Sequence, residues 1–216
     1  GKLNQSGLAG YVVGLSGGID SAVAAGLAVA AVGKDKVFAL LLPYRSSSKH
    51  SVDDATQYAR QLGIETKLVE ISPMIDAYFG TIDHSMRIRA GNKMARERMS
   101  IIFDHAHSMN RLVLGTGNRT EICLGDTTWF GDSACSLNPI GELYKSDVRA
   151  VARVLGVPPA IVAKVPTADL WEGQTDEGEL GLEYERVDRL LAMLIDRGIT
   201  SMPDLTKAGF DSTEIS

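Results

Sequence analysis

Cysteine is scarce in this sequence, and long hydrophobic runs are absent from it. The two cysteines, Cys123 and Cys135, are too few for a disulfide framework and lack metal-ligand spacing, so we expect two buried, small hydrophobic side chains. No run approaches the roughly 18 apolar residues of a membrane span, and the first residues do not form a charged and then apolar signal segment. We therefore expect a soluble, cytoplasmic protein with no membrane partner.

An excess of basic charge is also lacking. The 216 residues include 22 lysines and arginines against 27 aspartates and glutamates, which gives a net charge of −5. Broad affinity for nucleic acid depends on lysine and arginine side chains that neutralise phosphates, so this composition argues against a nucleic-acid partner. A hydrophobic content of 44% suffices for a substantial core, and we expect one domain over residues 1–216.

Short apolar runs alternate with helical patterns along the chain. The expected strands cover residues 11–15, 37–42, 66–71 and 112–114, and the expected helices cover residues 21–32, 53–62, 93–107, 146–155 and 183–195. Glycine, aspartate, asparagine and proline interrupt residues 125–143, where we expect a long functional loop. Strands that alternate with helices indicate parallel βαβ units. We therefore expect an α/β fold, a Rossmann-like three-layer parallel sheet with helices on both faces.

The first glycine-rich segment, Gly14-Leu-Ser-Gly-Gly-Ile-Asp-Ser21, joins an expected strand to an expected helix. Free backbone N–H groups and the positive end of a helix attract phosphate at such a place, and Gly17 and Gly18 let the backbone approach closely. A Walker loop would have glycine at position 19 and lysine at position 20, where this chain has Ile19 and Asp20. The phosphate-binding lysine is therefore replaced by a carboxylate.

A carboxylate beside phosphate oxygens is repelled unless a divalent cation lies between them. Asp20 is therefore best explained as a magnesium ligand, and Ser16 and Ser21 can donate hydroxyl hydrogen bonds. A tight turn with a capping serine or aspartate would explain the glycines and Asp20, but not the whole string. The string Ser16-Gly-Gly-Ile-Asp-Ser21 resembles the signature loop of the ATP pyrophosphatases, which holds the departing pyrophosphate.

A second glycine turn follows the expected strand at residues 112–114. In Leu112-Val-Leu-Gly-Thr-Gly-Asn118 the strand runs into the turn, and Glu121 falls in the first turn of the helix that we expect next. Asn118 and Glu121 fit a capping box, which needs no metal. A second magnesium ligand is the other interpretation of Glu121, and the residues of this segment alone leave both open.

Three further motifs resemble those of the NAD synthetases in order and spacing. They are Gly115-Thr-Gly-Asn-Arg-Thr-Glu121, Asn138-Pro-Ile-Gly-Glu-Leu-Tyr-Lys145, and Pro166-Thr-Ala-Asp-Leu-Trp171 with Gln174-Thr-Asp-Glu177. The likeness extends from about Gly10 to about Leu194. NAD synthetases adenylate the nicotinate carboxylate of deamido-NAD with ATP and then let ammonia displace AMP. The resemblance therefore implies an ATP-dependent ligase that produces NAD, AMP and pyrophosphate.

The resemblance also implies roles for individual residues. Magnesium would be held by Asp20 and Glu121, and the catalytic groups would be Asp20, Asp132 and Lys145. Asp132 would take a proton from ammonium or steer it toward the acyl-adenylate. Deamido-NAD would contact Arg96, Trp129 and Ser136. ATP would be bound by Gly14, Leu15, Ser16, Gly17, Gly18, Ile19, Asp20, Ser21, Thr116, Lys145 and Thr167.

Simpler interpretations stay open for several of these positions. Lys145 can be an ordinary surface lysine at a helix start, and Asp132 can be a loop-turn aspartate. Trp129 stands where many family members have a lysine, and it can stack on the nicotinate ring or pack the loop against the core. Arg98 lies two positions after Arg96, off its helical face, so packing or a subunit interface is one interpretation of it, and a solvated surface position is the one that we rank first.

The chain also departs from the family pattern. Ser133-Ala-Cys-Ser136 replaces a Gly-Gly-Ala-Asp run of many members, both ends are short, and we expect them to be truncated. No glutamine-hydrolysing segment precedes the first strand, so free ammonia is the expected nitrogen source, and the family resemblance implies a homodimer. Two rival functions are another ATP pyrophosphatase, such as a GMP synthetase or a tRNA-thiolating enzyme, and a non-catalytic nucleotide-binding module.

Overall fold

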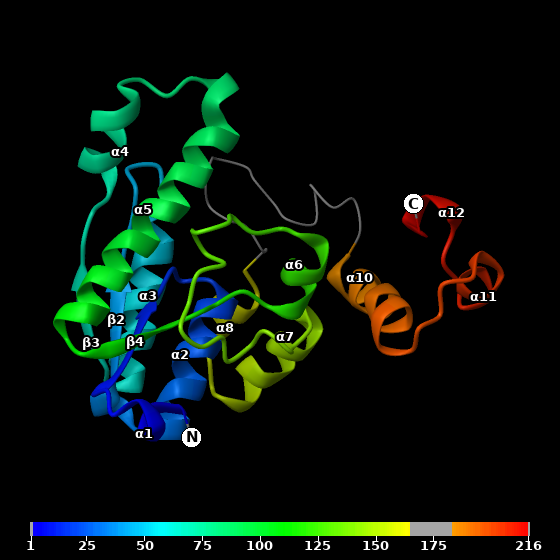
Figure 1. Ribbon diagram of the computed structural model, residues 1–216, viewed down its shortest axis with the longest axis horizontal. Helices are drawn as coiled ribbons and strands as arrows, with labels where there is room; N and C mark the ends of the chain where they lie inside the picture. The colour runs from blue at the N-terminus through cyan, green and yellow to red at the C-terminus, as the bar shows by residue number, and fades with distance from the viewer. Residues whose placement is uncertain (1, 165–182, 216) are drawn as a thin grey trace.

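The structure is a computed structural model that describes residues 2–164 and 183–215. The elements up to the last strand are α1 (Lys2–Ser6), β1 (Gly10–Gly14), α2 (Ile19–Val32), η1 (Lys34–Lys36), β2 (Val37–Leu41), α3 (Lys49–Leu62), β3 (Glu65–Leu68), α4 (Ser72–Phe79), η2 (His84–Met86), α5 (Arg87–Ser108) and β4 (Arg111–Leu114). The later elements are α6 (Arg119–Leu124), α7 (Lys145–Val154), α8 (Pro159–Val162), α10 (Tyr184–Leu191), the π-helical turn η3 (Ala192–Asp196), α11 (Met202–Lys207) and α12 (Ser212–Ile215). Strands and helices therefore alternate as far as β4 (Figure 1).

Four parallel strands form one sheet in the order β3-β2-β1-β4. Val12 of β1 pairs with Phe38 of β2 on one side and with Val113 of β4 on the other. All residues of β2 are buried, as expected for a parallel strand that is covered on both faces. β3 differs, because its four residues are exposed at the edge of the sheet.

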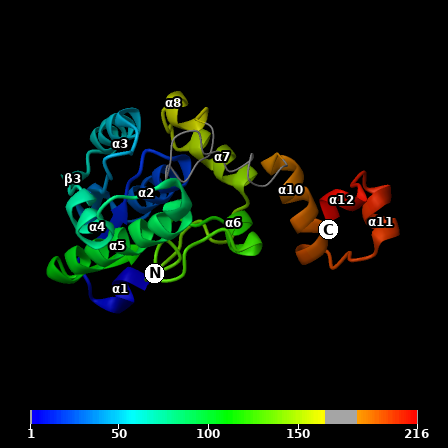
Figure 2. The ribbon, with the colours of Figure 1, turned by 90° about the horizontal axis from the view of Figure 1, so that it is seen from above.

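Helices cover both faces of this sheet. Tyr11 and Val13 of β1 belong to a core that also contains residues of α2, α3 and α7. Val12, which points the other way, belongs to a second core with residues of α4 and α5. Figure 2 shows α3 and α5 on opposite sides of the strands. The predicted three-layer α/β arrangement is therefore confirmed.

The connections place two loops at one point of the sheet. The chain runs from β1 through β2 to β3 on the α2 and α3 side, and α5 then returns it along the opposite face to β4, on the other side of β1. β2 therefore lies on one side of β1, and β4, which is reached over the opposite face, lies on the other side. The carboxyl ends of β1 and β4 form the switch point where ligands bind in such folds. The loops after β1 and β4 are therefore neighbours.

The structure corrects several expectations about individual segments. The expected strand at residues 66–71 ends at Leu68, and Ile71 is instead the N-cap of α4, a helix that the apolar pattern did not predict. Pro73 in the first turn of α4 is the signal that indicates it. Cys123 is exposed and Cys135 is partly exposed, so the expectation that both are buried is wrong. Cys123 lies on the short helix α6, and Cys135 lies in the following loop beside Gly115 at the end of β4.

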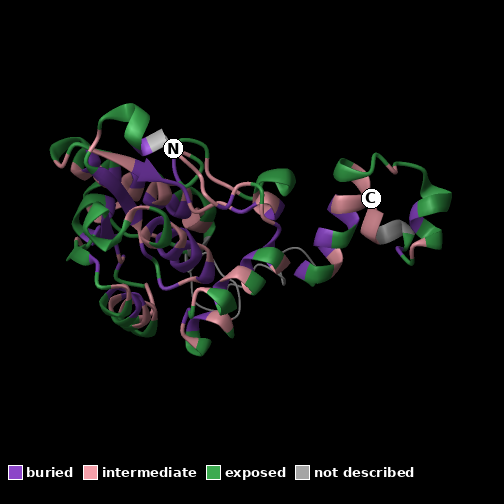
Figure 3. Cartoon of the chain, turned by 90° about the horizontal axis from the view of Figure 1, so that it is seen from below, coloured by how far each residue is buried: buried purple, intermediate pink, exposed green. Residues whose placement is uncertain are grey.

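The last helices lie beyond α6 and α7, away from the sheet (Figures 1 and 2). Leu190, Leu205 and Phe210 form a small core of their own there, and Val187 of α10 packs with Tyr144 beside α7. Figure 3 shows buried residues concentrated in the sheet-bearing part, with exposed residues around the outside. Within the described part of the chain, no helix is both long and apolar enough to cross a membrane.

Candidate active site

The phosphate loop (residues 14–21) connects β1 to α2 without a side-chain cap. Gly18 is the N-cap of this 14-residue helix and receives no side-chain cap hydrogen bond, so the first N–H groups of α2 can bind an anion. Gly17 has a φ of +83°, and a Cβ at this position would lie 2.2 Å from the carbonyl oxygen of Ser51. Position 17 therefore requires glycine, and the loop rests directly on α3.

The two serines of the phosphate loop bond mainly to the loop itself. The Ser21 hydroxyl donates to the carbonyl oxygen of Gly18 at 3.0 Å and accepts from the backbone N–H of Ser16 at 3.2 Å. The Ser16 hydroxyl accepts from the N–H of Gly18 at 3.2 Å and lies 3.1 Å from the Ser21 hydroxyl. These bonds hold the loop in shape, and the Ser21 hydroxyl donates its hydrogen bond within the loop.

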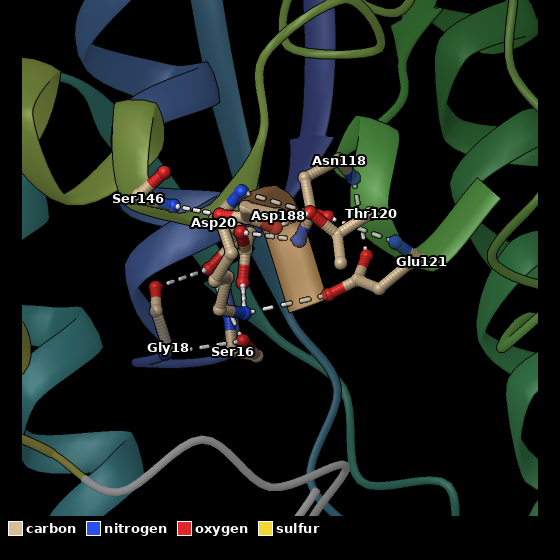
Figure 4. Close-up of polar contacts among 10 residues, drawn as sticks. Ser16, Gly18, Asp20, Asn118, Thr120, Glu121, Ser146 and Asp188 are labelled. Atoms are coloured by element: carbon tan, nitrogen blue, oxygen red, sulfur yellow. Dashed lines mark hydrogen bonds and ion pairs between the residues drawn. The ribbon is translucent and has the colours of Figure 1, made fainter. Parts of the chain in front are cut away.

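Asp20, Glu121 and Lys145 come from distant segments and meet at the switch point. Nζ of Lys145 lies 2.6 Å from Oδ2 of Asp20 and 3.4 Å from Oε1 of Glu121. Oδ1 of Asp20 accepts a 3.0 Å hydrogen bond from the side-chain amide of Asn118. Figure 4 shows Asp20, Asn118 and Glu121 gathered from the phosphate loop and the start of α6. Two carboxylates around one ammonium group leave an excess of negative charge.

Glu121 closes the predicted capping box, but this uses only one of its two oxygens. The N–H of Asn118 donates to Oε2 of Glu121 at 3.1 Å, and the N–H of Glu121 donates to Oδ1 of Asn118 at 3.0 Å. Oε1 faces Lys145. Desolvation, and then repulsion from Asp20, raise the pKa of Glu121 from 4.5 to about 8, although Lys145 opposes the shift. Capping therefore leaves this carboxylate directed into the site.

Lys145 is buried, so its interpretation as a surface lysine is wrong. The residue is only 2% exposed, and a buried ammonium group needs close negative partners to offset its lost hydration. Asp20 and Glu121 are those partners. The Nζ also lies 5.1 Å from the ring centroid of Tyr184, whose side chain is fully buried. The first residue of α7 thus directs a positive charge into the switch point.

The oxygen donors at this point suit Mg²⁺. Asp20 and Glu121 offer carboxylate oxygens, and repulsion from Asp20 adds to the desolvation that raises the pKa of Glu121. Within residues 2–164 and 183–215, no group of three or more His, Cys, Asp or Glu side chains forms a metal cluster. Mg²⁺ often takes one or two protein carboxylates together with substrate phosphates. The two acids therefore fit a cation shared with a bound phosphate.

A cavity of about 910 Å³ opens from the phosphate loop. It runs across the carboxyl ends of β1, β2 and β4 toward α5, and its size is in the range of small-molecule sites. The sequence-predicted residues that line it are Gly14, Leu15, Ser16, Gly18, Ile19, Asp20, Ser21, Thr116, Glu121, Asp132 and Lys145. Most of the predicted ATP residues are thus brought to one cavity.

Other predicted residues lie elsewhere. The expected deamido-NAD contacts Arg96, Trp129 and Ser136 are outside the cavity wall. Trp129 is 75% exposed, so the interpretation that it packs the loop against the core is wrong, and its carbonyl oxygen accepts a 3.0 Å bond from Nε of Arg96. The Ser136 hydroxyl accepts a 3.2 Å bond from the N–H of Val113. Thr167 and the motif at residues 174–177 lie outside the described residues.

Asp132 lines the cavity and also shapes the loop that carries it. Its Oδ1 accepts a 2.8 Å hydrogen bond from the N–H of Thr128, which is the turn role considered for this aspartate. The residue is at the surface, yet desolvation of its carboxyl group raises the pKa above the ordinary value. A turn aspartate on the cavity wall with increased basicity is compatible with proton transfer.

Three basic residues of the cavity wall were not predicted as site residues: Arg87, Arg98 and Lys164. Arg98 was expected to be solvated at the surface, but its Nε donates to the carbonyl oxygen of Leu42 at 2.9 Å, so that expectation is wrong. Lys164 donates to the carbonyl oxygen of Gly17 at 3.1 Å and to Oδ2 of Asp54 at 2.7 Å. Its sequence signal was weak, because a lone lysine just before the Pro166 motif has no distinctive pattern.

A parallel α/β sheet with a phosphate loop at its switch point places the chain among the α/β nucleotide-binding proteins. The comparisons narrow this class. A sequence model described as NAD synthase matches residues 1–216. The chain belongs to the NAD synthase family.

Individual relatives agree with this assignment. An NH(3)-dependent NAD(+) synthetase of Fusobacterium nucleatum is 47% identical over 210 residues, which cover 97% of this chain and 81% of the relative. The NH3-dependent NAD synthetase structure from Campylobacter jejuni has a TM-score of 0.81 at 34% identity, covering 99% of this chain and 83% of its own. A structure named NMN synthetase, from Francisella tularensis, has a TM-score of 0.81 at 38% identity, covering 87% and 79%.

Proposed function

We propose that this chain is an ammonia-dependent NAD synthetase, which amidates deamido-NAD with ATP to give NAD, AMP and pyrophosphate. The observation that carries the proposal is the meeting of Asp20, Glu121 and Lys145 beside the phosphate loop. Family membership supports the choice of acceptor, because relatives 47% identical to this chain are named NH(3)-dependent NAD(+) synthetases.

In the first step a carboxylate oxygen of the nicotinate attacks the α-phosphorus of ATP, and the bond to the bridging oxygen breaks to release pyrophosphate. The free N–H groups at the start of α2 would bind the departing pyrophosphate. Lys145 would stabilise the negative charge that grows during this step. Asp20 and Glu121 would hold Mg²⁺, which when bound supplies positive charge to phosphate oxygens.

In the second step ammonia attacks the carboxyl carbon of the adenylate, AMP leaves, and the nitrogen loses a proton to give the amide. Ammonia must first be formed from ammonium. Asp132 would accept that proton, since its carboxylate lines the cavity and its pKa is raised by desolvation. A cavity that buries the adenylate would also limit its hydrolysis by water.

The acceptor needs a direct test, because the segment that should recognise it departs from the family pattern. Trp129 is exposed and lies outside the cavity wall. The Francisella tularensis relative is named for NMN instead of NAD. Both deamido-NAD and nicotinate mononucleotide should therefore be offered, and we expect deamido-NAD to have the higher kcat/KM.

The test incubates the chain with ATP, Mg²⁺, ammonium and each acceptor, and follows NAD or NMN, AMP and pyrophosphate by chromatography. We expect equal amounts of NAD, AMP and pyrophosphate, and no NAD when glutamine replaces ammonium. Pyrophosphate without NAD would point to another ATP pyrophosphatase. ATP binding without turnover would indicate a non-catalytic nucleotide-binding module.

A further inference from the structure

Asp188 of α10 is a buried acid with both oxygens engaged by other helices. It is 5% exposed. Its Oδ1 accepts a 2.5 Å hydrogen bond from the Thr120 hydroxyl, and its Oδ2 accepts a 2.8 Å bond from the backbone N–H of Ser146. Thr120 is the second residue of α6 and Ser146 the second residue of α7. One carboxylate therefore joins the starts of two helices, as Figure 4 shows.

These two helix starts carry the charged residues of the candidate active site. Lys145 directly precedes Ser146, and Glu121 directly follows Thr120. The Thr120 hydroxyl uses its hydrogen for Asp188 and accepts a 3.0 Å hydrogen bond from the backbone N–H of Lys145. Asp188 therefore fixes the direction of a hydroxyl that itself holds the backbone of Lys145.

The same helix also supports the lysine side chain. Tyr184 lies one turn before Asp188 on α10, and its ring centroid is 5.1 Å from Nζ of Lys145. A lysine has a flexible four-carbon stem, so a fixed ammonium position requires contacts along the stem as well as at the backbone. α10 therefore places an aromatic ring beside the ammonium group and, through Thr120, supports the backbone of Lys145. It does so although it belongs to the group of helices outside the sheet-bearing part.

We propose that Asp188 is a positioning residue, which acts through Thr120 to hold Lys145 and Glu121 in reacting geometry. The inference rests on the proposed function, in which Lys145 and Glu121 act on ATP. Partners that orient functional side chains in this way typically change activity by about 10–100-fold when they are removed. Asp188 is not among the residues that line the cavity, so its effect on the reaction is indirect.

Asp196 of η3 provides a matched control. It bonds to the guanidinium of Arg119, the first residue of α6, and it accepts a 3.0 Å hydrogen bond from the hydroxyl of Tyr144, the N-cap of α7. Asp196 thus tethers the same two helices to the same C-terminal helices, but it has no described contact with Thr120 or Lys145. Its loss removes the tether without disturbing the Thr120 hydroxyl.

The test compares Asp188→Asn with Asp196→Asn in the full chain, at a temperature where circular dichroism shows both folded. The side chain of asparagine has one acceptor oxygen and one NH₂ group. Its NH₂ group would therefore face either the Thr120 hydroxyl or the N–H of Ser146, both of which donate to Asp188. We expect Asp188→Asn to lower kcat by about 10–100-fold, with the KM for deamido-NAD within about twofold. Asp196→Asn should stay within about threefold of the original kcat.

A second pair of variants keeps the inference testable if Asp188→Asn does not fold. Thr120→Ser retains the hydroxyl, whereas Thr120→Val removes it at nearly the same volume. The valine variant loses the hydrogen bond to Oδ1 of Asp188 and the one from the N–H of Lys145, while the Ser146 bond to Oδ2 of Asp188 stays. We expect the serine variant to keep most of the kcat and the valine variant to lose it. Equal kcat values for the two would overturn the proposal.

A readout without turnover separates this inference from the proposed function. In NMR of ¹⁵N-lysine-labelled protein, the Nζ signal of Lys145 should move in Asp188→Asn and stay in place in Asp196→Asn. If the wild-type chain makes no NAD, the function proposal fails, and the lysine signal alone decides the positioning role. An unmoved Lys145 signal, or equal losses of kcat in the two asparagine variants, would refute it.

Discussion

Nζ of Lys145 lies 2.6 Å from Oδ2 of Asp20, and the two residues are 125 positions apart in the sequence. A phosphate loop of the Walker type carries its own lysine. Here the positive charge arrives from α7, and the loop contributes an acid. The lysine that a Walker loop contains within one segment is thus supplied here by a second segment. Its position beside the loop therefore depends on the packing of α7.

Replacing Lys145 should damage both stability and activity. Lys145→Met leaves Asp20 and Glu121 without their close cation, and breaking a buried ion pair by removing one partner costs about 3–5 kcal/mol. We also expect kcat to fall by about 100-fold or more, because stabilisation of the growing phosphate charge is lost. Urea denaturation and steady-state NAD formation measure the two effects. A variant with normal kcat would contradict the role given to Lys145.

Asp20→Asn should preserve the fold but strongly reduce pyrophosphate release. The substitution keeps the acceptor for the Asn118 amide while it removes one carboxylate charge from the proposed Mg²⁺ site. The expected loss of turnover is about 100-fold or more, with an increased Mg²⁺ requirement. Asp35→Asn, at an exposed position of η1, is the control for a change of net charge. Unchanged pyrophosphate release in Asp20→Asn would refute the metal role.

The stability of the metal-free protein should fall as the pH rises from 4.5 to 8. The folded pKa of Glu121, about 8, lies above its ordinary value of 4.5, so the folded state holds this proton more tightly than the unfolded state. The contribution is complete below pH 4.5 and is lost as the pH passes through about 8. Urea midpoints in EDTA should therefore decline with pH more steeply for the wild type than for Glu121→Gln. An equally steep decline of the urea midpoint in both proteins would contradict the raised pKa of Glu121.

Lys164 should matter mainly for ATP binding. Its ammonium group ties the carbonyl oxygen of Gly17 to Asp54 of α3 and so holds the tip of the phosphate loop. Hydrogen bonds to charged groups contribute about 1.5–3 kcal/mol, so we expect Lys164→Met to raise the KM for ATP by roughly 10–100-fold. Lys67→Met on the exposed strand β3 is a suitable control. If Lys164→Met and Lys67→Met had the same KM for ATP, the phosphate loop would not depend on the hydrogen bonds of Lys164 for ATP binding.

The chain should form a homodimer, as the family resemblance implies. Trp129 and Phe130 are 75% and 78% exposed, and large apolar side chains at adjacent surface positions often lie in protein interfaces. Multi-angle light scattering should give twice the mass of one chain. A stable monomer at micromolar concentration would contradict this expectation.

Much of the sheet and of the phosphate loop could be predicted because these features are local. Buried strands such as β2 are continuous apolar runs, and glycines with Asp20 mark a strand-to-helix loop within a few residues. The capping box of Asn118 and Glu121 is likewise a spacing of three residues, and the structure confirms it. α4 was missed because its short apolar stretch directly follows a strand pattern.

The residues that were missed act across long distances in the sequence. Arg98 bonds to Leu42, and Lys164 bonds to Gly17, each through a backbone carbonyl that has no sequence signature of its own. Asp188 stands on the buried face of α10, where an acid among apolar residues is a signal of a special role, but that signal does not name its partners. Only the packing of the helices identifies them.

The sequence by itself indicated the family through the order of its motifs, and it predicted the α/β layering and the strand-to-helix position of the phosphate loop through apolar periodicity and local spacing. The tertiary structure decided that Lys145 is buried between two carboxylates, that Trp129 lies at the surface, and that α10 supports the site. These facts depend on which segments meet at the switch point. Strand order and helix packing fix that meeting, and neither is encoded in any single motif.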